Sequence, residues 1–270
     1  SEVIAKMVGR EIADLFPRRA SQVGEVVLAV DHLSVGDVLG RTRLHDVSFQ
    51  LRAGEVLGIG GLMGAGRTEL LMHLLGAWGQ RQSGSVSLQG KILPQADPVN
   101  ALRKGLALVS EDRRRYGLVL EEPIGFNLSL SSLHEVTQHG LVNRSAEAHR
   151  NREMYEALQV KATGLEAIVG RLSGGNQQKV VIGKALLTHP QAVILDEPTR
   201  GIDVGAKIEI YELINRLTAE GKAVLLVSSE LPELIGMSDR ILMLNAGRIG
   251  GSFSRAEATQ EKLMQAAVAS

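Results

Sequence analysis

The sequence predicts an α/β fold with a mostly parallel sheet and helices on both of its faces. Short apolar runs that are typical of buried strands alternate with longer helical patterns along much of the chain. One strand-to-helix connection is rich in glycine, and another apolar run ends in two adjacent carboxylates. Parallel strands present such groups at their carboxyl ends, where α/β proteins bind ligands. A binding site is therefore expected at that edge.

The composition is that of a globular protein with balanced charge. Of the 270 residues 44% are hydrophobic, and thirty Lys and Arg side chains match thirty Asp and Glu side chains. This balance disfavours nucleic acid as a partner. The lack of cysteine excludes disulfides and thiolate metal sites, and the seven histidines show no metal-ligand spacing. No apolar run reaches the ~20 residues that cross a bilayer.

An amphipathic stripe over residues 1–16, ended by Pro17, predicts a helix. We interpret it as a linker helix that packs on this domain or on one preceding it; a membrane-surface helix is the alternative. The periodicity then predicts the following elements. Strands are expected over 26–30, 47–51, 55–60, 83–88, 106–109, 192–195, 223–228 and 241–244, and helices over 69–75, 206–217, 231–237 and 257–268. A helical block from 123 to 167, with an unbroken helix over 146–158, interrupts the alternation.

The glycine-rich connection spans residues 61–68 and has the strand–loop–helix context of a phosphate-binding loop. Backbone N–H groups of such a loop point at one anion, and the helix N-terminus adds its positive end. Arg67 stands where G-x-x-x-x-G-K-[ST] has lysine, and its planar fork differs from a compact ammonium. An ordinary glycine-rich turn is the alternative. The nucleotide-binding residues expected here are Gly61, Gly64, Ala65, Gly66, Arg67, Thr68 and Glu69, with the Thr68 hydroxyl on a nucleotide-bound Mg²⁺.

Asp196 and Glu197 follow the strand expected over 192–195. They would be presented at the same sheet edge as the phosphate loop. We expect Asp196 to lie in the Mg²⁺ shell and Glu197, as the catalytic residue, to polarise the attacking water. A solvated strand end is the alternative.

A second glycine motif opens the helical pattern that carries Val180, Val181 and Ile182. Two glycines in a first helical turn leave backbone N–H groups open to an anion. A plain cap needs only the serine, and each glycine costs about 1 kcal/mol relative to alanine. The pattern therefore favours a binding function. The motif consists of Leu172, Ser173, Gly174, Gly175, Asn176 and Gln177.

In this order, the phosphate loop, the serine–glycine motif and the Asp-Glu pair resemble the nucleotide-binding domain of ABC ATPases. More narrowly, residues 61–70, 110–113, 196–201 and 227–230 look like the C-terminal half of bacterial monosaccharide-importer ATPases of the ribose, galactose and xylose type. Those polypeptides fuse two nucleotide-binding domains. The resemblance covers residues 23–255, and residues 1–20 resemble the linker between halves.

The resemblance implies a P-loop ABC-type nucleotide-binding domain with a mostly parallel core sheet, an antiparallel β subdomain and an inserted helical subdomain. The implied division is a linker helix at 1–22, the domain at 23–255 with its helical subdomain at about 121–170, and a C-terminal helix at 256–270. Position 1 is Ser rather than Met. We therefore expect a piece of a longer polypeptide whose first nucleotide-binding half precedes it.

In this family each ATP lies between two domains, and the resemblance assigns further residues. Asp203 is the aspartate of the loop after the acids, the D-loop. Glu111 stands where a glutamine usually contacts Mg²⁺, and Ser229 stands where a switch histidine contacts the γ-phosphate. Residues 31–45 offer no aromatic side chain for adenine. The resemblance thus implies a weak primary ATP site and a signature motif that keeps its serine and glycines. Because Glu197 is retained, complete loss of catalysis is not expected.

The implied function is that of the ATP-binding subunit half of a sugar importer, which couples ATP binding and hydrolysis to transport and uses ATP and Mg²⁺. Its partners would be the first nucleotide-binding half, transmembrane permease subunits and, indirectly, a periplasmic sugar-binding protein. Its place would be peripheral, at the cytoplasmic face of the bacterial inner membrane. The alternatives are a regulatory domain that binds nucleotide without hydrolysing it, and a soluble tandem ABC protein of translation or DNA repair.

Two surface features complete the interpretation. The run Arg113, Arg114 and Arg115 is typical of a solvated loop, with contact to nucleotide or to the transmembrane partner as the alternative. In the family, the start of the helical insertion meets a short helix of the membrane subunit. Phe126 is the expected anchor there, since aromatic side chains dominate interface energetics; packing within its own subdomain is the alternative.

Overall fold

The computed structural model of the protein describes residues 15–268. The helix expected over residues 1–16 therefore lies almost wholly outside the described residues.

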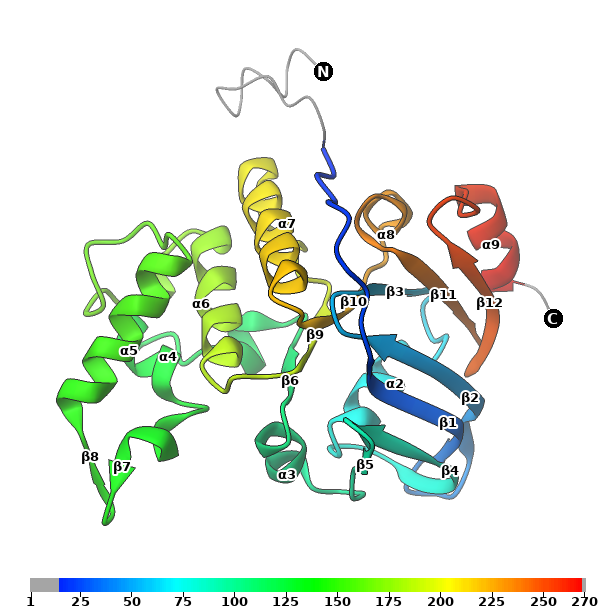
Figure 1. The fold of residues 1–270 in the computed structure, drawn as a ribbon, viewed down its shortest axis with the longest axis horizontal. Coiled ribbons are helices and arrows are strands. Elements are labelled where there is room, and N and C mark those ends of the chain that lie inside the picture. The colour runs from blue at the N-terminus through cyan, green and yellow to red at the C-terminus, as the bar shows by residue number, and fades with distance from the viewer. Residues whose placement is uncertain (1–14, 269–270) are drawn as a thin grey trace.

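A six-stranded sheet forms the centre of the molecule (Figure 1). Its strand order is β12-β11-β3-β10-β9-β6, and every neighbouring pair is parallel except β11 with β12. The expected mostly parallel sheet is thus confirmed. The strands are β3 (Val56–Gly61), β6 (Leu106–Val109), β9 (Ala192–Asp196), β10 (Ala223–Val227), β11 (Arg240–Asn245) and β12 (Arg248–Ser254). The sequence did not predict β12, because this edge strand contains two glycines and no apolar run.

A second, antiparallel sheet has the order β2-β1-β4-β5. It contains β1 (Val26–Gly36), β2 (Thr42–Arg52), β4 (Gln80–Leu88) and β5 (Lys91–Ile92). The first three are longer than the apolar runs that predicted them, because their polar ends are held by pairing across the sheet rather than by burial. Helix α2 (Arg67–Leu74) packs between this sheet and the central one.

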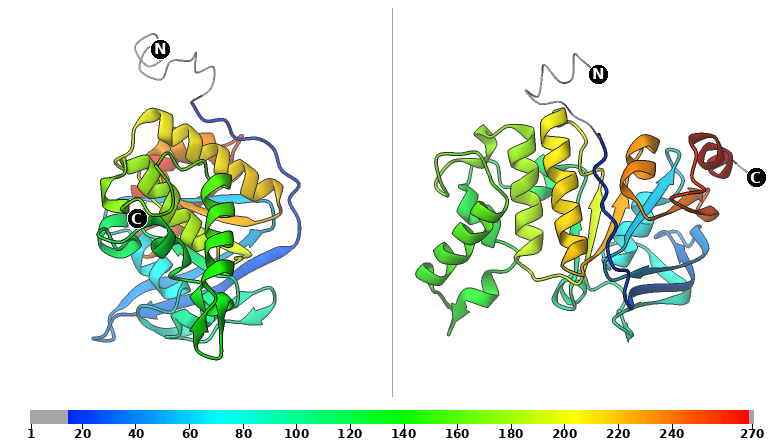
Figure 2. Two further views of the ribbon diagram at one scale, coloured as in Figure 1. Left: turned by 90° about the vertical axis from the view of Figure 1, so that its left-hand side faces the viewer. Right: turned by 45° about the horizontal axis from the view of Figure 1, so that its top comes forward.

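Alternation along the central strands divides the molecule into two cores. Leu225 and Val227 of β10 face a core shared with β1, β2 and α2. Val224 and Leu226 face the opposite core, shared with α6 (Gly174–Leu186) and α7 (Val204–Ala219). Successive side chains of a strand point to opposite faces, so one apolar run serves both cores. Figure 2 shows α6 and α7 side by side on one face, with α8 (Leu231–Met237) beside α7.

The expected helical block is inserted between β6 and α6, but it is not wholly helical. Its elements are α4 (Ile124–Ser129), the 3-10 turn Leu133–Val136, β7 (Thr137–Gln138), β8 (Leu141–Val142), α5 (Arg144–Ala157) and the 3-10 turn Val169–Arg171. The hairpin β7–β8 corrects the expectation; its strands are too short to show periodicity. A bridge between Pro123 and Ile168 joins the two ends of the block.

The sequence interpretation also missed helix α3 (Pro98–Arg103) and a π-helical turn. Helix α3 has Pro at its first position, and the Asp97 side chain caps it by accepting from Asn100 N at 2.9 Å. These start signals were readable. A π-helical turn spans Arg113–Gly117 and is likewise capped by Asp112.

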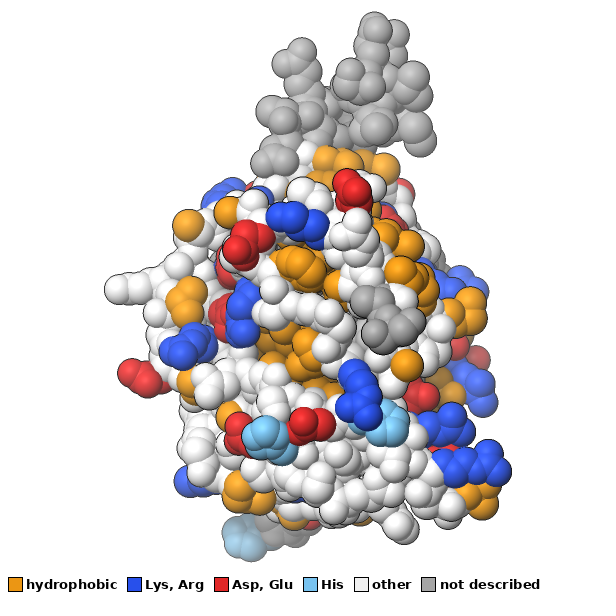
Figure 3. Space-filling model, turned by 90° about the vertical axis from the view of Figure 1, so that its right-hand side faces the viewer, with side chains coloured by type: hydrophobic (Ala, Val, Ile, Leu, Met, Phe, Trp, Pro, Cys, Tyr) orange, Lys and Arg blue, Asp and Glu red, His pale blue; other side chains and the backbone are white. Residues whose placement is uncertain are grey.

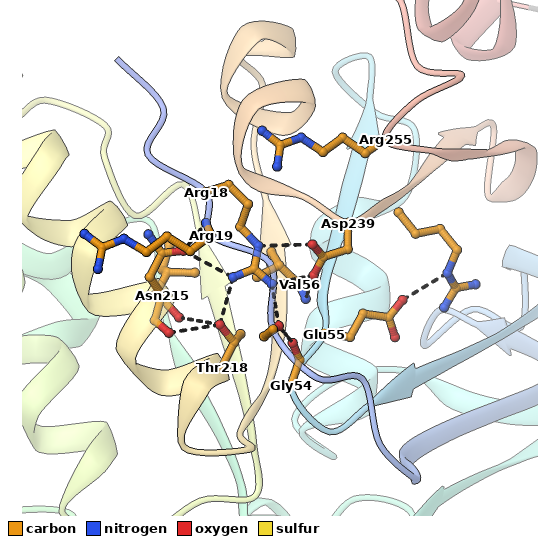
Figure 4. A network of polar contacts seen from close by, with 12 residues as sticks. Arg18, Arg19, Gly54, Glu55, Val56, Asn215, Thr218, Asp239 and Arg255 are labelled. Carbon is orange, nitrogen blue, oxygen red and sulfur yellow. Dashed lines mark hydrogen bonds and ion pairs between the residues drawn. The ribbon is translucent and has the colours of Figure 1, made fainter. Parts of the chain in front are cut away.

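Arg18 fixes the segment before β1 to the base of the central sheet (Figure 4). Its buried guanidinium donates to Asp239 at 2.5 and 3.1 Å, and to Asn215 and Thr218 at the end of α7 at 3.2 and 2.8 Å. Asp239 also accepts from the backbone N of Val56 at 2.8 Å, at the start of β3. One side chain therefore ties together the N-terminal segment, α7 and the start of two central strands.

Helix α9 (Gln260–Val268) covers the end of the central sheet formed by β11 and β12. It packs against β11 through Leu263, Ala266 and Ala267. Figure 3 faces this end and shows hydrophobic side chains around the end of the described chain. Met264 and Val268 are exposed there. Within residues 15–268, no helix combines the length and the hydropathy that a membrane span requires.

Candidate functional site

The topology brings four predicted groups to one edge of the central sheet. β3, β10, β9 and β6 are consecutive parallel neighbours, and Val227 pairs with both Ile59 and Asp196. Their carboxyl ends therefore lie together. The phosphate loop follows β3, Ser229 follows β10, Asp196 ends β9, and Glu111 follows β6.

The loop after β3 has the curled backbone expected of a phosphate loop. Gly61, Gly64 and Gly66 have φ angles of 155°, 79° and 102°, which side-chain-bearing residues rarely adopt. A Cβ on Gly61 would lie 2.7 Å from the carbonyl oxygen of Leu244. Gly66 then caps α2, whose first turn holds Arg67, Thr68 and Glu69. Loop and helix start thus adopt the shape that presents backbone N–H groups to an anion.

Arg67 and Ser229, two of the three positions at which the sequence departs from the pattern it resembles, both contact the carboxylate of Glu197. Arg67 Nη1 lies 3.2 Å from Glu197 Oε1, and Ser229 Oγ donates to Oε2 at 3.1 Å. Only 9% of Glu197 is exposed, and its φ of 48° turns the chain out of β9. The structure therefore joins the expected catalytic acid to both the phosphate loop and the switch position.

Asp196 lies in a region of concentrated negative charge. Burial, Glu111 and Glu197 raise the pKa of Asp196 to about 7, while Arg67 and Arg200 oppose that shift. Glu111 itself pairs with Arg200, at 3.1 Å between Oε2 and Nη1. A cation would relieve the repulsion among the three carboxylates. In the described part of the chain no group of three or more His, Cys, Asp or Glu could hold a metal alone. Mg²⁺ in nucleotide sites needs only one or two carboxylates plus phosphate oxygens, so the residues fit it.

The serine–glycine motif lies at the start of α6. Ser173 is the cap residue but makes no side-chain cap bond; its Oγ instead accepts from Asn176 Nδ2 at 3.0 Å. Gln177 is buried and donates from Nε2 to Val169 O at 3.3 Å. A Cβ on Gly175 would lie 2.4 Å from the Cβ of Ala206, so α6 and α7 approach closely there. Among the described residues, no hydrogen bond joins residues 172–177 to residues 61–69.

Asp203 already has a structural role. It is the cap of α7, and its Oδ1 accepts from Ala206 N at 3.0 Å. This capping holds the start of α7 at the same point where Gly175 packs on Ala206. The loop after Glu197 and the start of α6 are thereby adjacent.

The sequence interpretation missed a buried polar triad formed by Thr199, Tyr211 and Glu233. Thr199 Oγ1 and Tyr211 OH both donate to Glu233 Oε1, at 2.6 and 2.9 Å. All three residues are almost fully buried, and burial together with the Glu233 charge raises the pKa of Tyr211. The ring of Phe16 lies 5.6 Å from that of Tyr211. The available signal was an acid inside the otherwise apolar pattern of residues 231–237.

The sequence analysis expected the run of Arg113, Arg114 and Arg115 to form a solvated loop. Arg115 stacks over Tyr116, 5.1 Å from the ring centroid. Arg113 is partly buried and donates to oxygens of Gln177, Arg200 and Gly201. The expectation of a solvated loop is therefore wrong for Arg113.

The ABC transporter family matches residues 44–200, which include the phosphate loop, the serine–glycine motif and the Asp-Glu pair. This chain belongs to the ABC transporter family. The match runs continuously from β2 to the loop after β9, across the inserted helical block.

This family member is similar to curated proteins that are described as xylose import ATP-binding proteins. It is 53% identical over 267 residues to a xylose import ATP-binding protein of Geobacillus kaustophilus, and 46% identical over 269 residues to one of Thermoanaerobacter pseudethanolicus. These alignments cover 98% and 99% of this chain but 53% of each relative. The chain therefore spans about half the length of the curated relatives it matches.

Solved structures confirm the fold. An ATP-binding cassette of an ABC transporter, MJ1267 in its ADP conformation, aligns with a TM-score of 0.76 at 20% identity over 92% of this chain and 100% of its own. The structure of an ATP-binding subunit of an ABC transporter aligns with a TM-score of 0.69 at 26% identity over 88% of this chain and 98% of its own. The expected ABC-type α/β fold is thus confirmed.

Proposed function

We propose that this chain is the second nucleotide-binding half of a monosaccharide importer and that its main catalytic contribution is its signature motif. The observation that carries this is the asymmetry between its two candidate surfaces. The phosphate loop binds the chain's own Glu197 through Arg67. The signature keeps Ser173, Gly174 and Gly175 at the open start of α6.

In this proposal the division of the chain is a linker at 1–22, a nucleotide-binding domain at 23–255 with its helical subdomain at about 121–170, and a terminal helix at 256–270. The bridge between Pro123 and Ile168 supports the helical unit. The partners are a first nucleotide-binding half in the same polypeptide, transmembrane permease subunits and, indirectly, a periplasmic sugar-binding protein. The chain works peripherally at the cytoplasmic face of the inner membrane. The names of the relatives make xylose the first sugar to test.

The substrate is ATP with Mg²⁺, which supplies charge stabilisation between the phosphates and the acids when bound. Thr68, Asp196 and Glu111 are the residues that would hold it. On this half's own loop, Glu197 competes with phosphate for the charge of Arg67, and Ser229 offers a hydroxyl in place of an imidazole. The site therefore binds ATP weakly. The open N–H groups at the start of α6 instead face the phosphates of ATP bound by the other half.

The decisive experiment measures transport by the complete importer in proteoliposomes. It compares wild type with a phosphate-loop variant, Arg67→Ala, and a signature variant, Ser173→Arg. Sugar uptake and phosphate release that depend on ATP and collapse with Ser173→Arg support the proposal. Unchanged uptake in that variant contradicts the signature role. Nucleotide binding without any phosphate release in the assembled protein would indicate a regulatory domain. Co-purification with ribosomes or DNA rather than with permease would indicate a tandem ABC protein of translation or repair.

A further inference from the structure

Arg113 joins three segments that are far apart in the sequence. Its Nε donates to Gln177 Oε1 at 3.4 Å, its Nη1 to Arg200 O at 3.1 Å and its Nη2 to Gly201 O at 3.3 Å. Gln177 lies in the first turn of α6, which carries the signature. Arg200 and Gly201 lie in the loop that follows Glu197. The guanidinium therefore bridges the signature helix and the loop after the expected catalytic acid.

The glycines around this guanidinium show that the contact is built into the local packing. A Cβ on Gly174 would lie 2.9 Å from Arg113 Nη2 and 3.1 Å from Gly201 O. Gly201 has a φ of 67°, a left-handed backbone conformation that residues with a side chain rarely adopt. Gly174 thus has a second role beside anion binding: it leaves space for the guanidinium.

Gln177 and the turn that contains Arg113 are themselves held by further hydrogen bonds. Gln177 donates to Val169 O at 3.3 Å, where the helical block returns to the core. On the other side, Asp112 caps the turn that contains Arg113 by accepting from Arg115 N at 3.0 Å. Glu111, one residue before that cap, pairs with Arg200. The contacts of Arg113 and Arg200 thus connect Glu111 and the helical block with both the signature and the loop after Glu197.

We propose that Arg113 is a positioning residue that makes the first turn of α6 and the loop after Glu197 move as one body during the ATPase cycle. This inference rests on the proposed function, because it concerns how the signature is held for the other half's ATP. Only arginine meets the geometry: its planar fork offers five donors in fixed directions, whereas lysine offers a single centre that cannot reach three acceptors on two segments.

The test uses the complete importer with Arg113→Ala and Arg113→Lys, and with the adjacent Arg114→Ala as the control. We expect Arg113→Ala to lower kcat for sugar-stimulated phosphate release by about 10-fold or more, a range known for misplaced catalytic groups, while KM for ATP changes by less than about twofold. Arg113→Lys should recover only part of the loss, and Arg114→Ala should match wild type. An unchanged kcat, a loss confined to KM, or full recovery by lysine would overturn the proposal.

Amide hydrogen exchange separates positioning from a general loss of stability. In the same variants, exchange should rise both at residues 173–177 and at residues 199–203, while the strands of the antiparallel sheet keep their protection. Faster exchange in only one of the two segments, or everywhere, contradicts the bridge. If Ser173→Arg is also silent in the transport assay, the proposed function itself fails; if only Arg113→Ala is silent, the positioning role alone fails.

Discussion

The guanidinium of Arg67 donates to the carboxylate of Glu197 across 3.2 Å, between Nη1 and Oε1. The cation of the phosphate loop is thus engaged by the acid expected to activate water. The side chains are 19% and 9% exposed, so water screens this pair only partly. A phosphate that recruits Arg67 competes with this partner for the guanidinium. Within residues 15–268, the other side-chain donor to the Glu197 carboxylate is Ser229.

The isolated chain should bind MgATP weakly and release phosphate near background. The reasons are the Arg67–Glu197 pair, Ser229 at the switch position, and the absence of an aromatic platform within residues 31–45. Calorimetric titration and a phosphate-release assay measure both quantities. Sub-micromolar binding with turnover near 1 per second, an ordinary enzyme rate, would contradict the prediction.

Glu197→Gln should tighten MgATP binding to the isolated chain, because it removes the charge that competes with phosphate for Arg67. An increase of about 10-fold corresponds to ~1.4 kcal/mol. The matched control is Ser229→Ala, which removes a neutral donor from the same carboxylate and should change affinity less. Equal affinities for Glu197→Gln and wild type would show that the ion pair does not limit binding.

Ser173→Arg should impair transport by the complete importer more than Arg67→Ala does. Under the proposed function, the bulky charge would displace the donors that face the other half's γ-phosphate, and loss of one such donor costs on the order of 10²–10³ in rate. Arg67 belongs to a site that already departs from the pattern at Glu111 and Ser229. Uptake rates at saturating ATP compare the two variants. Equal loss, or greater loss for Arg67→Ala, would show that the departing site is needed for assembly or turnover.

Arg18→Ala should destabilise the chain by about 3 kcal/mol, since removing one partner of a buried ion pair costs about 3–5 kcal/mol and Asp239 retains some solvent. The Arg18 side chain is 0% exposed and that of Asp239 is 26% exposed. Arg19→Ala is the matched control: its pair with Glu212 is exposed, so the change should stay below about 1 kcal/mol. Urea unfolding gives both free energies. Equal effects would mean that Arg18 does not fix the N-terminal segment.

Glu233→Leu should destabilise the chain, because the hydroxyls of Thr199 and Tyr211 lose their shared acceptor inside the core. Each buried donor without a partner costs about 1–3 kcal/mol. Tyr211→Phe should cost less, since Thr199 still satisfies Glu233. The free energies of unfolding decide the order, and a larger loss for Tyr211→Phe would contradict it.

Phe126→Ala should weaken assembly with the permease while changing the free energy of unfolding little. The side chain is 44% exposed on α4, so it has area available to a partner. Leu141→Ala, at an exposed position in the hairpin of the same block, is the control and should leave assembly unchanged. Co-purification with the permease measures the effect. Unchanged assembly for Phe126→Ala would remove it from the interface.

Local sequence patterns were sufficient for the parallel sheet, most of its strands and the residues that gather at its edge. Apolar runs and glycine spacing are local properties, and the carboxyl ends of parallel strands meet wherever such strands pair. Gly61 and Gly66 were readable for the same reason, because the positive φ angles of this local turn favour glycine at both positions. Edge strand β12 and the hairpin β7–β8 were not readable, because pairing rather than periodicity holds them.

Tertiary structure alone decided which polar side chains contact one another. Arg67 and Glu197 are 130 residues apart, Arg113 and Gly201 are 88 apart, and Arg18 and Asp239 are 221 apart. Periodicity describes which face of an element is buried, but not which side chain of another element lies opposite. Sequence thus determined that a phosphate loop, a signature and an acid pair exist here. Packing determined that Arg67 binds Glu197, that Arg113 connects the signature with the loop after Glu197, and that Glu233 accepts from two buried hydroxyls.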